Sequence, residues 1–248
     1  MAAPRSLSGG TPTPRGSPTD ASPLSAHVLQ EHASTLGLGL GAQQVESLLA
    51  YAALLRRWNR VHNLTAIDSD ADLLTHHLLD CLAIVRPLQE HFAALPQSGT
   101  LSFLDAGSGG GLPGIPLAIA LPEWRGTLVD AVQKKCAFLE QARLELGLPN
   151  IAVRHARLES LPLAASGLVV SRAFASLDDF VRLTWALLEP GGYWAAMKGR
   201  QPEAELAQVP AGAEHVGTIT LRVPLLDEQR HLVILRKAPG APAPARRP

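Results

Sequence analysis

A glycine-rich turn between an apolar strand and a helix constrains this chain more than any other feature. Residues 101–104 form a short apolar run, and Asp105-Ala-Gly107-Ser-Gly109-Gly-Gly111-Leu-Pro-Gly114 follows it. Glycines at positions 107, 109 and 111 allow a sharp backbone turn and the close approach of a ligand. The helix after such a turn directs unpaired N–H groups and the positive end of its dipole at that ligand. The segment therefore predicts a ligand-binding turn at the start of an α/β domain.

An acidic residue marks the end of the next predicted strand. Asp130 closes the run Thr127-Leu-Val-Asp130 and lies 23 residues after Gly107. In nucleotide-binding α/β units, an acid at this place accepts hydrogen bonds from the two hydroxyls of an adenosine ribose. The turn and this acid together predict a nucleoside-cofactor site with Gly107, Gly109 and Asp130 among its contacts.

Two classes of cofactor compete for these glycines. Residues 109–114 satisfy the dinucleotide pattern G-x-G-x-x-G, whereas residues 105–111 satisfy D-x-G-x-G-x-G, which is typical of S-adenosylmethionine enzymes. A dinucleotide needs free helix N–H groups for its pyrophosphate, but Pro113 and Pro116 remove two of those donors. S-adenosylmethionine has no phosphate, and its ammonium group suits a carboxylate or carbonyl near Asp105. We therefore favour S-adenosylmethionine over a dinucleotide, and a turn that binds no ligand is the least favoured interpretation.

Composition divides the chain into four parts. Residues 1–23 are rich in Pro, Gly, Ser and Thr and predict a disordered extension, and the Pro/Ala-rich residues 238–248 predict a disordered tail. Between them, residues 24–96 predict an N-terminal helical cap, and residues 97–237 predict a cofactor-binding core.

Two helices are expected in the cap. Apolar residues recur at i, i+3 and i+4 spacing between Val45 and Trp58, with Arg56, Arg57 and Arg60 beside this apolar face. A second helix is expected over residues 70–88, ending at Pro87 or shortly beyond it.

Strands alternate with helices in the core. The expected strands span residues 101–106, 126–130, 151–155, 167–172, 192–198, 214–223 and 230–237. The expected helices span residues 113–120, 133–146 and 177–188. This alternation predicts a doubly wound, mostly parallel sheet that binds its ligands at the C-terminal strand ends. The last two strands predict a C-terminal β-hairpin, which is typical of class I S-adenosylmethionine methyltransferases and not of dinucleotide domains.

Charge and cysteine content limit the possible partners. The 22 Lys and Arg residues balance the 22 Asp and Glu residues, whereas a protein that grips duplex phosphates is usually basic. Any recognition of nucleic acid must therefore be local or shared with other proteins. Cys81 and Cys136 have neither disulfide-framework nor metal-site spacing, so we expect a reducing compartment and no metal. The chain has no run of 18 apolar residues and no signal-peptide core, so we expect a cytoplasmic protein without a membrane partner.

Six separate segments, in the same order, resemble the RsmG (GidB) methyltransferases, and the resemblance covers about residues 48–236. The segments are Trp58-Asn-Arg-Val-His-Asn63-Leu-Thr-Ala-Ile67, His77-Leu-Leu-Asp80-Cys-Leu, Asp105-Ala-Gly-Ser-Gly-Gly-Gly-Leu-Pro-Gly-Ile-Pro116, Ser171-Arg-Ala-Phe-Ala175-Ser-Leu, Met197-Lys-Gly199 and Arg230-His-Leu-Val233. The resemblance implies a class I methyltransferase that transfers a methyl group from S-adenosylmethionine to N7 of guanine 527 in 16S ribosomal RNA. Given this target, the neutral net charge suggests the hypothesis that the substrate is 16S rRNA within the structured small ribosomal subunit or an assembly intermediate. We expect the enzyme to act as a monomer.

The resemblance also implies individual cofactor contacts. Gly107 and Leu112 are expected against the cofactor, Leu158 and Glu159 at its adenine side, and Arg172 as the remaining contact. Each position falls at or just after the C-terminal end of a predicted strand. Two alternatives stay open: Glu159 as a solvated loop acid, and Arg172 as the ion-pair partner of a core carboxylate.

We expect no catalytic base, because guanine N7 carries a lone pair and no proton. Candidate RNA contacts are the cationic side chains of Arg56, Arg57, Arg60, Lys198 and Arg200. A solvated helix face is an equally good interpretation of the three cap arginines.

Four polar residues in or next to the family segments have no role that the sequence assigns. His76 and His77 invite a metal or acid–base interpretation, but neighbours on a helix point in different directions, so structural support is favoured. His77 and Asp80 are spaced to bond each other. Asn63 and Asp80 either shape the pocket or cap helices.

Two rivals remain: a nicotinamide-linked oxidoreductase, and a catalytically silent RNA-binding or ribosome-assembly module with the same fold.

Overall fold

The computed structural model describes residues 24–66, 69–95, 100–161, 164–172, 174–200 and 202–245. The predicted extension 1–23 lies outside these residues. Within the described part, neither cysteine forms a disulfide, and no group of three His, Cys, Asp or Glu side chains is arranged to hold a metal. None of the described helices has both the length and the apolar character needed to cross a bilayer.

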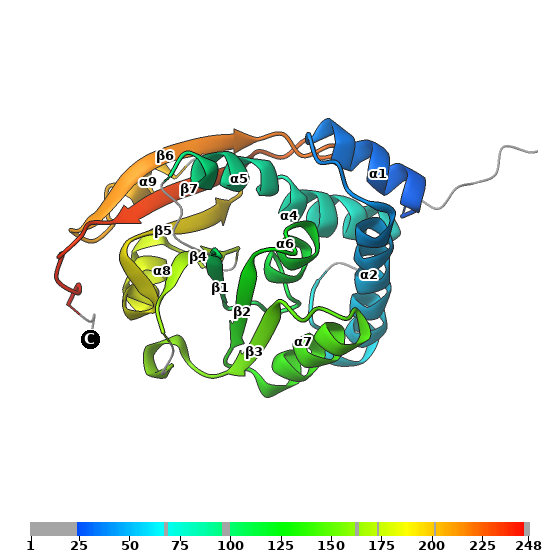
Figure 1. Ribbon diagram of the computed structural model, residues 1–248, viewed down its shortest axis with the longest axis horizontal. Helices are drawn as coiled ribbons and strands as arrows, with labels where there is room; N and C mark the ends of the chain where they lie inside the picture. The colour runs from blue at the N-terminus through cyan, green and yellow to red at the C-terminus, as the bar shows by residue number, and fades with distance from the viewer. Residues whose placement is uncertain are drawn as a thin grey trace, which may run out of the picture.

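A seven-stranded sheet forms the centre of the molecule (Figure 1). Its strands are β1 Ser102–Ala106, β2 Arg125–Asp130, β3 Ile151–His155, β4 Ser166–Ser171, β5 Leu188–Lys198, β6 Ala213–Leu221 and β7 Arg230–Lys237. The spatial order is β3-β2-β1-β4-β5-β7-β6. The first five strands are parallel, and β7 runs antiparallel to both β5 and β6. This confirms the predicted doubly wound sheet with a C-terminal hairpin, the fold of class I S-adenosylmethionine methyltransferases.

The strand order reverses beside β1, and this reversal places the site. β1 lies between β2 and β4, so the chain runs from β1 toward one edge of the sheet through β2 and later crosses to the other side of β1 to form β4. A crevice opens outside the C-terminal strand ends at such a point. The glycine turn follows β1 there, between the ends of β2 and β4.

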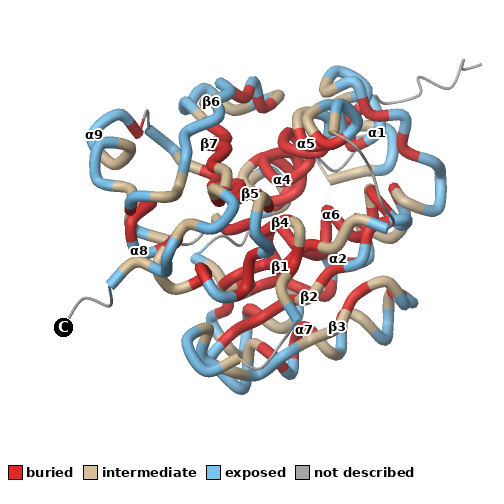
Figure 2. Tube along the Cα trace, turned by 60° about the vertical axis from the view of Figure 1, so that its left-hand side comes forward, coloured by how far each residue is buried: buried red, intermediate tan, exposed pale blue. Residues whose placement is uncertain are grey.

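Alternate residues of each strand feed two separate hydrophobic layers, and the buried strands lie between them (Figure 2). One face presents Phe103, Leu128, Leu168, Tyr193 and Leu232 to the larger cluster, which contains the apolar sides of the N-terminal helices. The other face presents Leu104, Val129, Val169, Trp194 and Val233 to a smaller cluster built largely on one helix, α8. The period-two alternation expected of strands therefore accounts for both layers.

The N-terminal helices pack directly on the α/β unit. The helices α1 (Ala26–Thr35) and α2 (Ala42–His62) contact each other, and α2 also contacts α6 (Gly114–Ala120) and α7 (Gln133–Glu145). The Tyr51 hydroxyl on α2 donates a 2.5 Å hydrogen bond to the Gly110 carbonyl in the glycine turn. The cap thus shares one apolar cluster with the core and also holds the turn from outside. The proposed boundary between cap and core at residues 96–97 falls in a part that the structure does not describe.

The prediction of a single helix over residues 70–88 is wrong. The chain instead forms α3 (Asp70–Asp72), the π-helix η1 (Leu73–Leu79), α4 (Asp80–Leu82) and α5 (Val85–Ala93). Pro87 does not end a helix, because it is the third residue of α5. Its missing N–H has no intrahelical partner to lose in a first turn. A π-helical turn widens the winding, and such turns frequently occur at functional sites.

The remaining helices follow the prediction with two differences. The helix expected over residues 177–188 is α8 (Leu177–Thr184) followed by the 3-10 turn η3 (Trp185–Leu187), and β5 already begins at Leu188. Short helices η2 (Leu158–Ser160) and α9 (Glu203–Leu206) also form.

The segment after β7 lies along the body of the protein. The backbone N–H of Ala238 donates a hydrogen bond to the Gly212 carbonyl, and the guanidinium of Arg182 on α8 donates one to the Ala245 carbonyl. Residues 238–245 therefore contact the body of the protein near α8, and the predicted disorder of residues 238–248 stays a prediction.

Candidate functional site

The turn after β1 is fastened to the neighbouring strand β2. The backbones of Ser108 and Val129 are joined by a 2.9 Å hydrogen bond, and Val129 also donates to the Ser108 hydroxyl at 3.1 Å. The same hydroxyl donates to the Asp105 carbonyl at 2.9 Å. Ser108 is buried, so these bonds form away from water. The turn is therefore a rigid part of the sheet edge.

The glycines of the turn have two different reasons to be glycine. Gly107 and Gly109 adopt left-handed φ angles of 71° and 57°, and a Cβ on Gly107 would point into open space. A Cβ on Gly111 would instead meet Ile115 at 2.5 Å, and one on Gly114 would meet the Asp105 carboxylate at 2.6 Å. Gly107 and Gly109 therefore border open space, whereas Gly111 and Gly114 allow close packing against Ile115 and Asp105.

The start of α6 offers no free N–H group to a phosphate. Gly114 donates to the Asp105 carboxylate at 3.0 Å, and Ile115 donates to the Gly111 carbonyl at 2.8 Å. Pro116 has no N–H, and Leu117 donates to the Pro113 carbonyl. A dinucleotide needs such groups free for its pyrophosphate. The geometry therefore disfavours the dinucleotide interpretation.

Asp105 is a buried carboxylate with one oxygen to spare. Its Oδ2 accepts from Gly114, and its Oδ1 is buried without a hydrogen-bond partner within the described part of the chain. Burial raises the pKa of this carboxyl to about 7, against the lowering effect of the Gly114 bond. An unpaired buried acceptor is costly unless a ligand supplies a donor. The ammonium group of S-adenosylmethionine is such a donor, so this residue fits the predicted cofactor.

Asp130 holds the turn from β2. Its Oδ2 accepts from the Gly109 backbone at 2.9 Å, and its Oδ1 accepts from Val132 at 2.8 Å. Lys135 lies 3.8 Å from the same carboxylate. Each carboxylate oxygen has a second lone pair, so a ribose contact is compatible with these bonds. The predicted ribose contact stays a prediction.

A cavity of about 280 Å³ collects most of the predicted cofactor residues. Gly107, Gly109, Leu112 and Arg172 all line it, from the ends of β1 and β4. Leu64, Thr65 and Lys135 line it as well and were not predicted. We call this space the glycine cavity. Thr65 lies within a family segment, which was the only sequence signal for it.

Leu158 and Glu159 lie elsewhere. They line a different cavity, of about 480 Å³, between η2 and α8, together with Trp185 and Pro244. Glu159 is exposed and Leu158 half-buried. The structure therefore does not bring their side chains to the glycine cavity, and their adenine-side role stays a prediction.

Arg172 is anchored by a buried carboxylate. Its Nη1 lies 2.7 Å from the His76 carbonyl and 3.2 Å from Asp80 Oδ2. The other oxygen of Asp80 lies 3.2 Å from Nε of Arg230, at the start of β7. Arg172 therefore forms the ion pair with a core carboxylate that was left open as an alternative. Arg172 also lines the glycine cavity, as expected of a cofactor contact. Asp80 is a bridge between two arginines.

Asn63 and His77 have structural roles. Asn63 caps α2 in the left-handed conformation, with φ 49°. His77 Nε2 lies 2.9 Å from the Thr65 hydroxyl, so the expected bond between His77 and Asp80 is wrong. The expected bond assumed the spacing of an α-helix. η1 is a π-helix with a wider winding, so side chains three residues apart do not lie at that spacing. Burial lowers the pKa of His77 to about 4, which keeps the ring neutral near pH 7.

The five candidate RNA contacts differ in their surroundings. Arg56 pairs with Asp70, and Arg57 lies 3.0 Å from Glu145. Lys198 Nζ lies 2.7 Å from Glu205 and has only a tenth of its side chain exposed. Arg60 and Arg200 are exposed.

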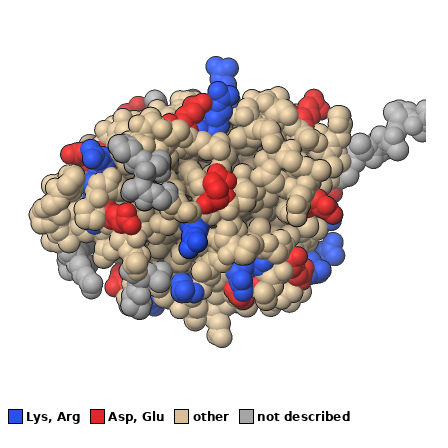
Figure 3. Space-filling model, viewed as in Figure 1, with Lys and Arg blue, Asp and Glu red and all other residues tan. Residues whose placement is uncertain are grey.

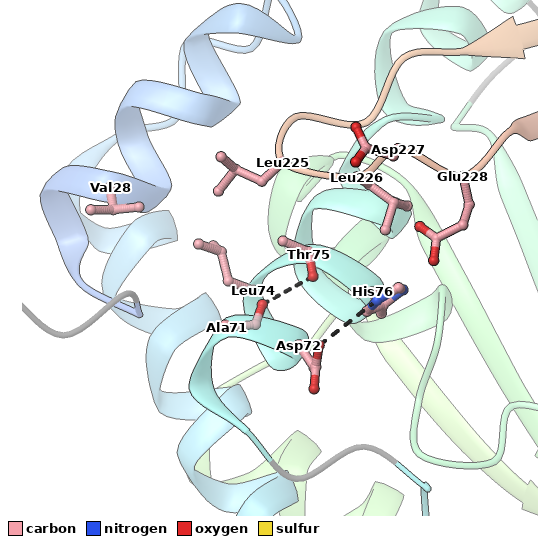
Figure 4. Close-up of a pocket in the computed structure, with 10 residues that line it drawn as sticks. All are labelled: Val28, Ala71, Asp72, Leu74, Thr75, His76, Leu225, Leu226, Asp227 and Glu228. Carbon is pink, nitrogen blue, oxygen red and sulfur yellow. Dashed lines mark hydrogen bonds and ion pairs between the residues drawn. The ribbon is translucent and has the colours of Figure 1, made fainter.

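The molecular surface has no dominant charge on the face seen in Figure 3, where cationic and anionic side chains are scattered among uncharged ones. A further cavity, of about 430 Å³, lies between α1, η1 and the loop before β7 (Figure 4). Its charged lining consists of Asp72, Asp227 and Glu228 with His76, and Leu225 reaches toward it from the loop. An acidic lining repels phosphate, so this cavity is a poor place for RNA.

Comparison with known proteins identifies close relatives. The family described as rRNA small subunit methyltransferase G (GidB) matches residues 44–233. Ribosomal RNA small subunit methyltransferase G of Ralstonia nicotianae is 52% identical over 214 residues, which are 86% of this chain and 95% of that protein. The protein of the same name from Methylibium petroleiphilum is 46% identical over 220 residues, covering 89% of this chain and 97% of that one.

Similarity to solved structures supports the fold. The 1,6-didemethyltoxoflavin-N1-methyltransferase of Burkholderia thailandensis superposes with a TM-score of 0.53 at 18% identity, covering 76% of this chain and 89% of that chain. The [4+2]-cyclase SpnF superposes with a TM-score of 0.54 at 16% identity, covering 82% and 98%.

Proposed function

This chain belongs to the rRNA small subunit methyltransferase G family, and from that premise we propose that it methylates N7 of guanine 527 in 16S ribosomal RNA. The methyl donor is S-adenosylmethionine, the cofactor of enzymes with this fold. Most of the length of the curated relatives is matched by this chain, so the proposal concerns the whole activity of the family.

The glycine cavity is the observation that carries the proposal. Two left-handed glycines border it, and the helix that follows them starts without free N–H groups. The Asp105 carboxylate, two residues before Gly107, does not line the cavity, but one of its buried oxygens has no partner among the described residues. These features suit a cofactor that has an ammonium group and no phosphate. Gly107, Gly109, Leu112 and Arg172 would border it, and Asp105 would face the ammonium group. Asp130 at the ribose, and Leu158 and Glu159 at the adenine, complete the proposed contacts.

The reaction needs no general base from this chain. The bound cofactor supplies an electrophilic methyl group on a sulfonium, and guanine N7 attacks with a lone pair that carries no proton. No His or carboxylate side chain is among the described residues that line the glycine cavity. We therefore assign no catalytic residue whose removal alone abolishes the chemistry.

The protein contributes orientation and electrostatics. Ser108 and Tyr51 fix the turn from two sides, so the walls of the cavity do not need to reorganise when a ligand binds. Holding two reacting atoms in line is worth several kcal/mol of the barrier, about 7 or more in the best intramolecular cases. The purine gains positive charge as it is methylated, and a bare cation beside it would oppose this. Asp80 pairs with Arg172, one of the two cationic residues among those that line the glycine cavity.

The substrate we propose is folded RNA in the small subunit or an assembly intermediate. N7 is poorly reached in A-form RNA, because its major groove is deep and narrow, so the target base must lie in an open region or be splayed out. The balanced net charge provides little general attraction for RNA, which favours recognition through local contacts on a structured particle. We propose that the enzyme acts there as a cytoplasmic monomer, with Arg56, Arg57, Arg60, Lys198 and Arg200 as candidate RNA contacts.

Transfer of labelled methyl from S-adenosylmethionine tests the proposal. Small subunits from a strain that lacks this enzyme are the substrate, and protein-free 16S rRNA and large subunits are the comparisons. We expect label in small subunits, less in protein-free rRNA and none in large subunits. Comparable turnover on protein-free rRNA would contradict the proposed particle. Cofactor binding without label in any substrate would instead favour a silent assembly module.

A further inference from the structure

A second cavity lies on the other side of Arg172 from the glycine turn. It has a volume of about 360 Å³ and is lined by His76, His77, Asp80, Arg172, Met197, Lys198, Gly199 and Arg230. We call it the arginine cavity. Arg172 lines both the arginine cavity and the glycine cavity, so this side chain borders the two spaces. A molecule in the arginine cavity is therefore next to the proposed methyl donor.

Asp80 organises this cavity. Its carboxylate is buried, and each of its oxygens lies 3.2 Å from a different guanidinium. One guanidinium belongs to Arg172, just after β4, and the other to Arg230, at the start of β7. Asp80 itself comes from the start of α4, so its carboxylate joins two arginine side chains from other parts of the chain. Such a pair is held more firmly than two exposed arginines would be.

Both guanidinium groups keep donors in reserve. A guanidinium has five N–H groups. In the described structure, Arg172 uses those of Nη1 on His76 and Asp80, and Arg230 uses Nε on Asp80 and Nη1 on the Gln229 carbonyl. The two side chains are a quarter and a fifth exposed, so part of each reaches the cavity. Forked N–H donors fixed in this way match the oxygens of a phosphate.

The charge of the cavity favours an anion. Arg172, Arg230 and Lys198 are three cations, and the two carboxylates paired with them, Asp80 and Glu205, leave an excess of one positive charge. The cavity of Figure 4, beyond His76, is lined by three carboxylates instead. An anionic ligand at this end of the sheet is therefore drawn to the arginine cavity.

We propose that the arginine cavity binds the phosphate of the acceptor nucleotide, with Arg172 and Arg230 as its ligands and Asp80 as the residue that positions both. This inference rests on the proposed function, because it deepens the description of the RNA substrate. A phosphate held there places the attached nucleoside beside Arg172, at the border of the glycine cavity. Specific placement of the acceptor then comes from a paired set of arginines, which explains how a chain without net charge grips RNA.

Arg230→Gln is the first test, and the chain provides a matched control. Arg182 on α8 is also about a fifth exposed and also bonds a buried carboxylate, that of Asp178. We expect Arg230→Gln to raise the KM for small subunits roughly tenfold to a hundredfold through loss of a charged hydrogen bond. S-adenosylmethionine binding should be unchanged, and Arg182→Gln should leave the KM unchanged. Thermal unfolding of both variants corrects for any loss of folded protein.

The salt dependence of RNA binding separates phosphate contact from a structural role. Removing one phosphate contact lowers the slope of log K against log salt concentration by about 0.7 to 0.9. We expect this loss in Arg230→Gln, its recovery in Arg230→Lys, and no change in Arg182→Gln. An unchanged slope in Arg230→Gln would overturn the proposal even if the KM rose.

Asp80→Asn gives the sharpest discrimination. This change adds one unit of positive charge to the cavity, so a purely electrostatic role for the arginines predicts tighter RNA binding. Positioning by Asp80 predicts weaker binding, by roughly tenfold, with S-adenosylmethionine still bound. Tighter or equal binding would refute the role of Asp80.

The outcomes distinguish this inference from the proposed function. Normal methyl transfer by the wild-type protein together with an unchanged KM in Arg230→Gln overturns the arginine cavity alone. Absence of methyl transfer by the wild-type protein overturns the function itself.

Discussion

Alanine at Gly107 should abolish tight cofactor binding while costing the fold little. Gly107 has a φ of 71°, and an L-residue in this left-handed region costs about 1 to 2 kcal/mol. The added Cβ meets no protein atom within 4 Å, because it enters the open side of the glycine cavity. The strain alone lowers the melting temperature by about 2 to 8 °C for a chain of this size. A ligand in the cavity meets the methyl group directly, which costs about 1 to 3 kcal/mol or more of affinity.

Gly147 provides the matched control for this prediction. It has a φ of 60° and equally open space around its missing Cβ, but it follows α7 and lines none of the cavities described above. Gly147→Ala should therefore lower the melting temperature by the same amount as Gly107→Ala. It should keep full affinity for S-adenosylmethionine, measured by titration calorimetry. Gly107→Ala should lose at least about tenfold in affinity, and Gly107→Arg should lose binding altogether. Equal affinities of the two alanine variants would refute the assignment of the glycine cavity.

Three further predictions follow from buried groups. Affinity for S-adenosylmethionine should fall as the pH drops through about 7, because burial raises the pKa of the Asp105 carboxyl to that value. The protonated carboxyl no longer attracts the ammonium group of the cofactor. Asp105→Asn should remove this pH dependence of the affinity, measured by calorimetry. The free energy of unfolding should fall as the pH drops from about 6.5 toward 4. Burial lowers the pKa of His77 to about 4, so the unfolded chain takes up this proton at a higher pH than the folded chain. His77→Gln should reduce this pH dependence of the free energy of unfolding, measured by urea titration. Tyr51→Phe should lower the free energy of unfolding by about 1 to 3 kcal/mol, because the Gly110 carbonyl loses its buried donor, and a change below about 0.5 kcal/mol in denaturant titration would contradict this.

The sheet was largely readable from the sequence, because its strands are short apolar runs bounded by turn residues. The strands β3 and β7 span the predicted residues, and β1 and β2 differ by one residue at one end. β5 begins four residues earlier than expected. Leu188 already pairs with Ser166, and the register shifts across the segment that contains Gly191 and Gly192. Pairing between distant strands decided this boundary, and no local pattern reports it.

Spacing alone predicted the site only where it is local in the chain. Gly107 and Gly109 lie in one glycine-rich segment, whereas Leu112 and the distant Arg172 were predicted through the family resemblance. The bridge of Asp80 to Arg172 and Arg230 joins three distant segments, and a single sequence contains no signal that pairs them. The expected contact between His77 and Asp80 failed for a different reason: it assumed α-helical winding, and the chain forms a π-helix there.

We propose that this chain places the methyl group on N7 of one guanine in small-subunit RNA. Reduction and aniline cleavage of the methylated RNA test it most directly, because they break the chain at 7-methylguanine. Small subunits from a strain lacking the enzyme would be treated with the protein and S-adenosylmethionine, and the RNA then cleaved and mapped by primer extension. We expect a single new break, at guanine 527 of 16S rRNA. Incorporated methyl groups without that break would contradict it.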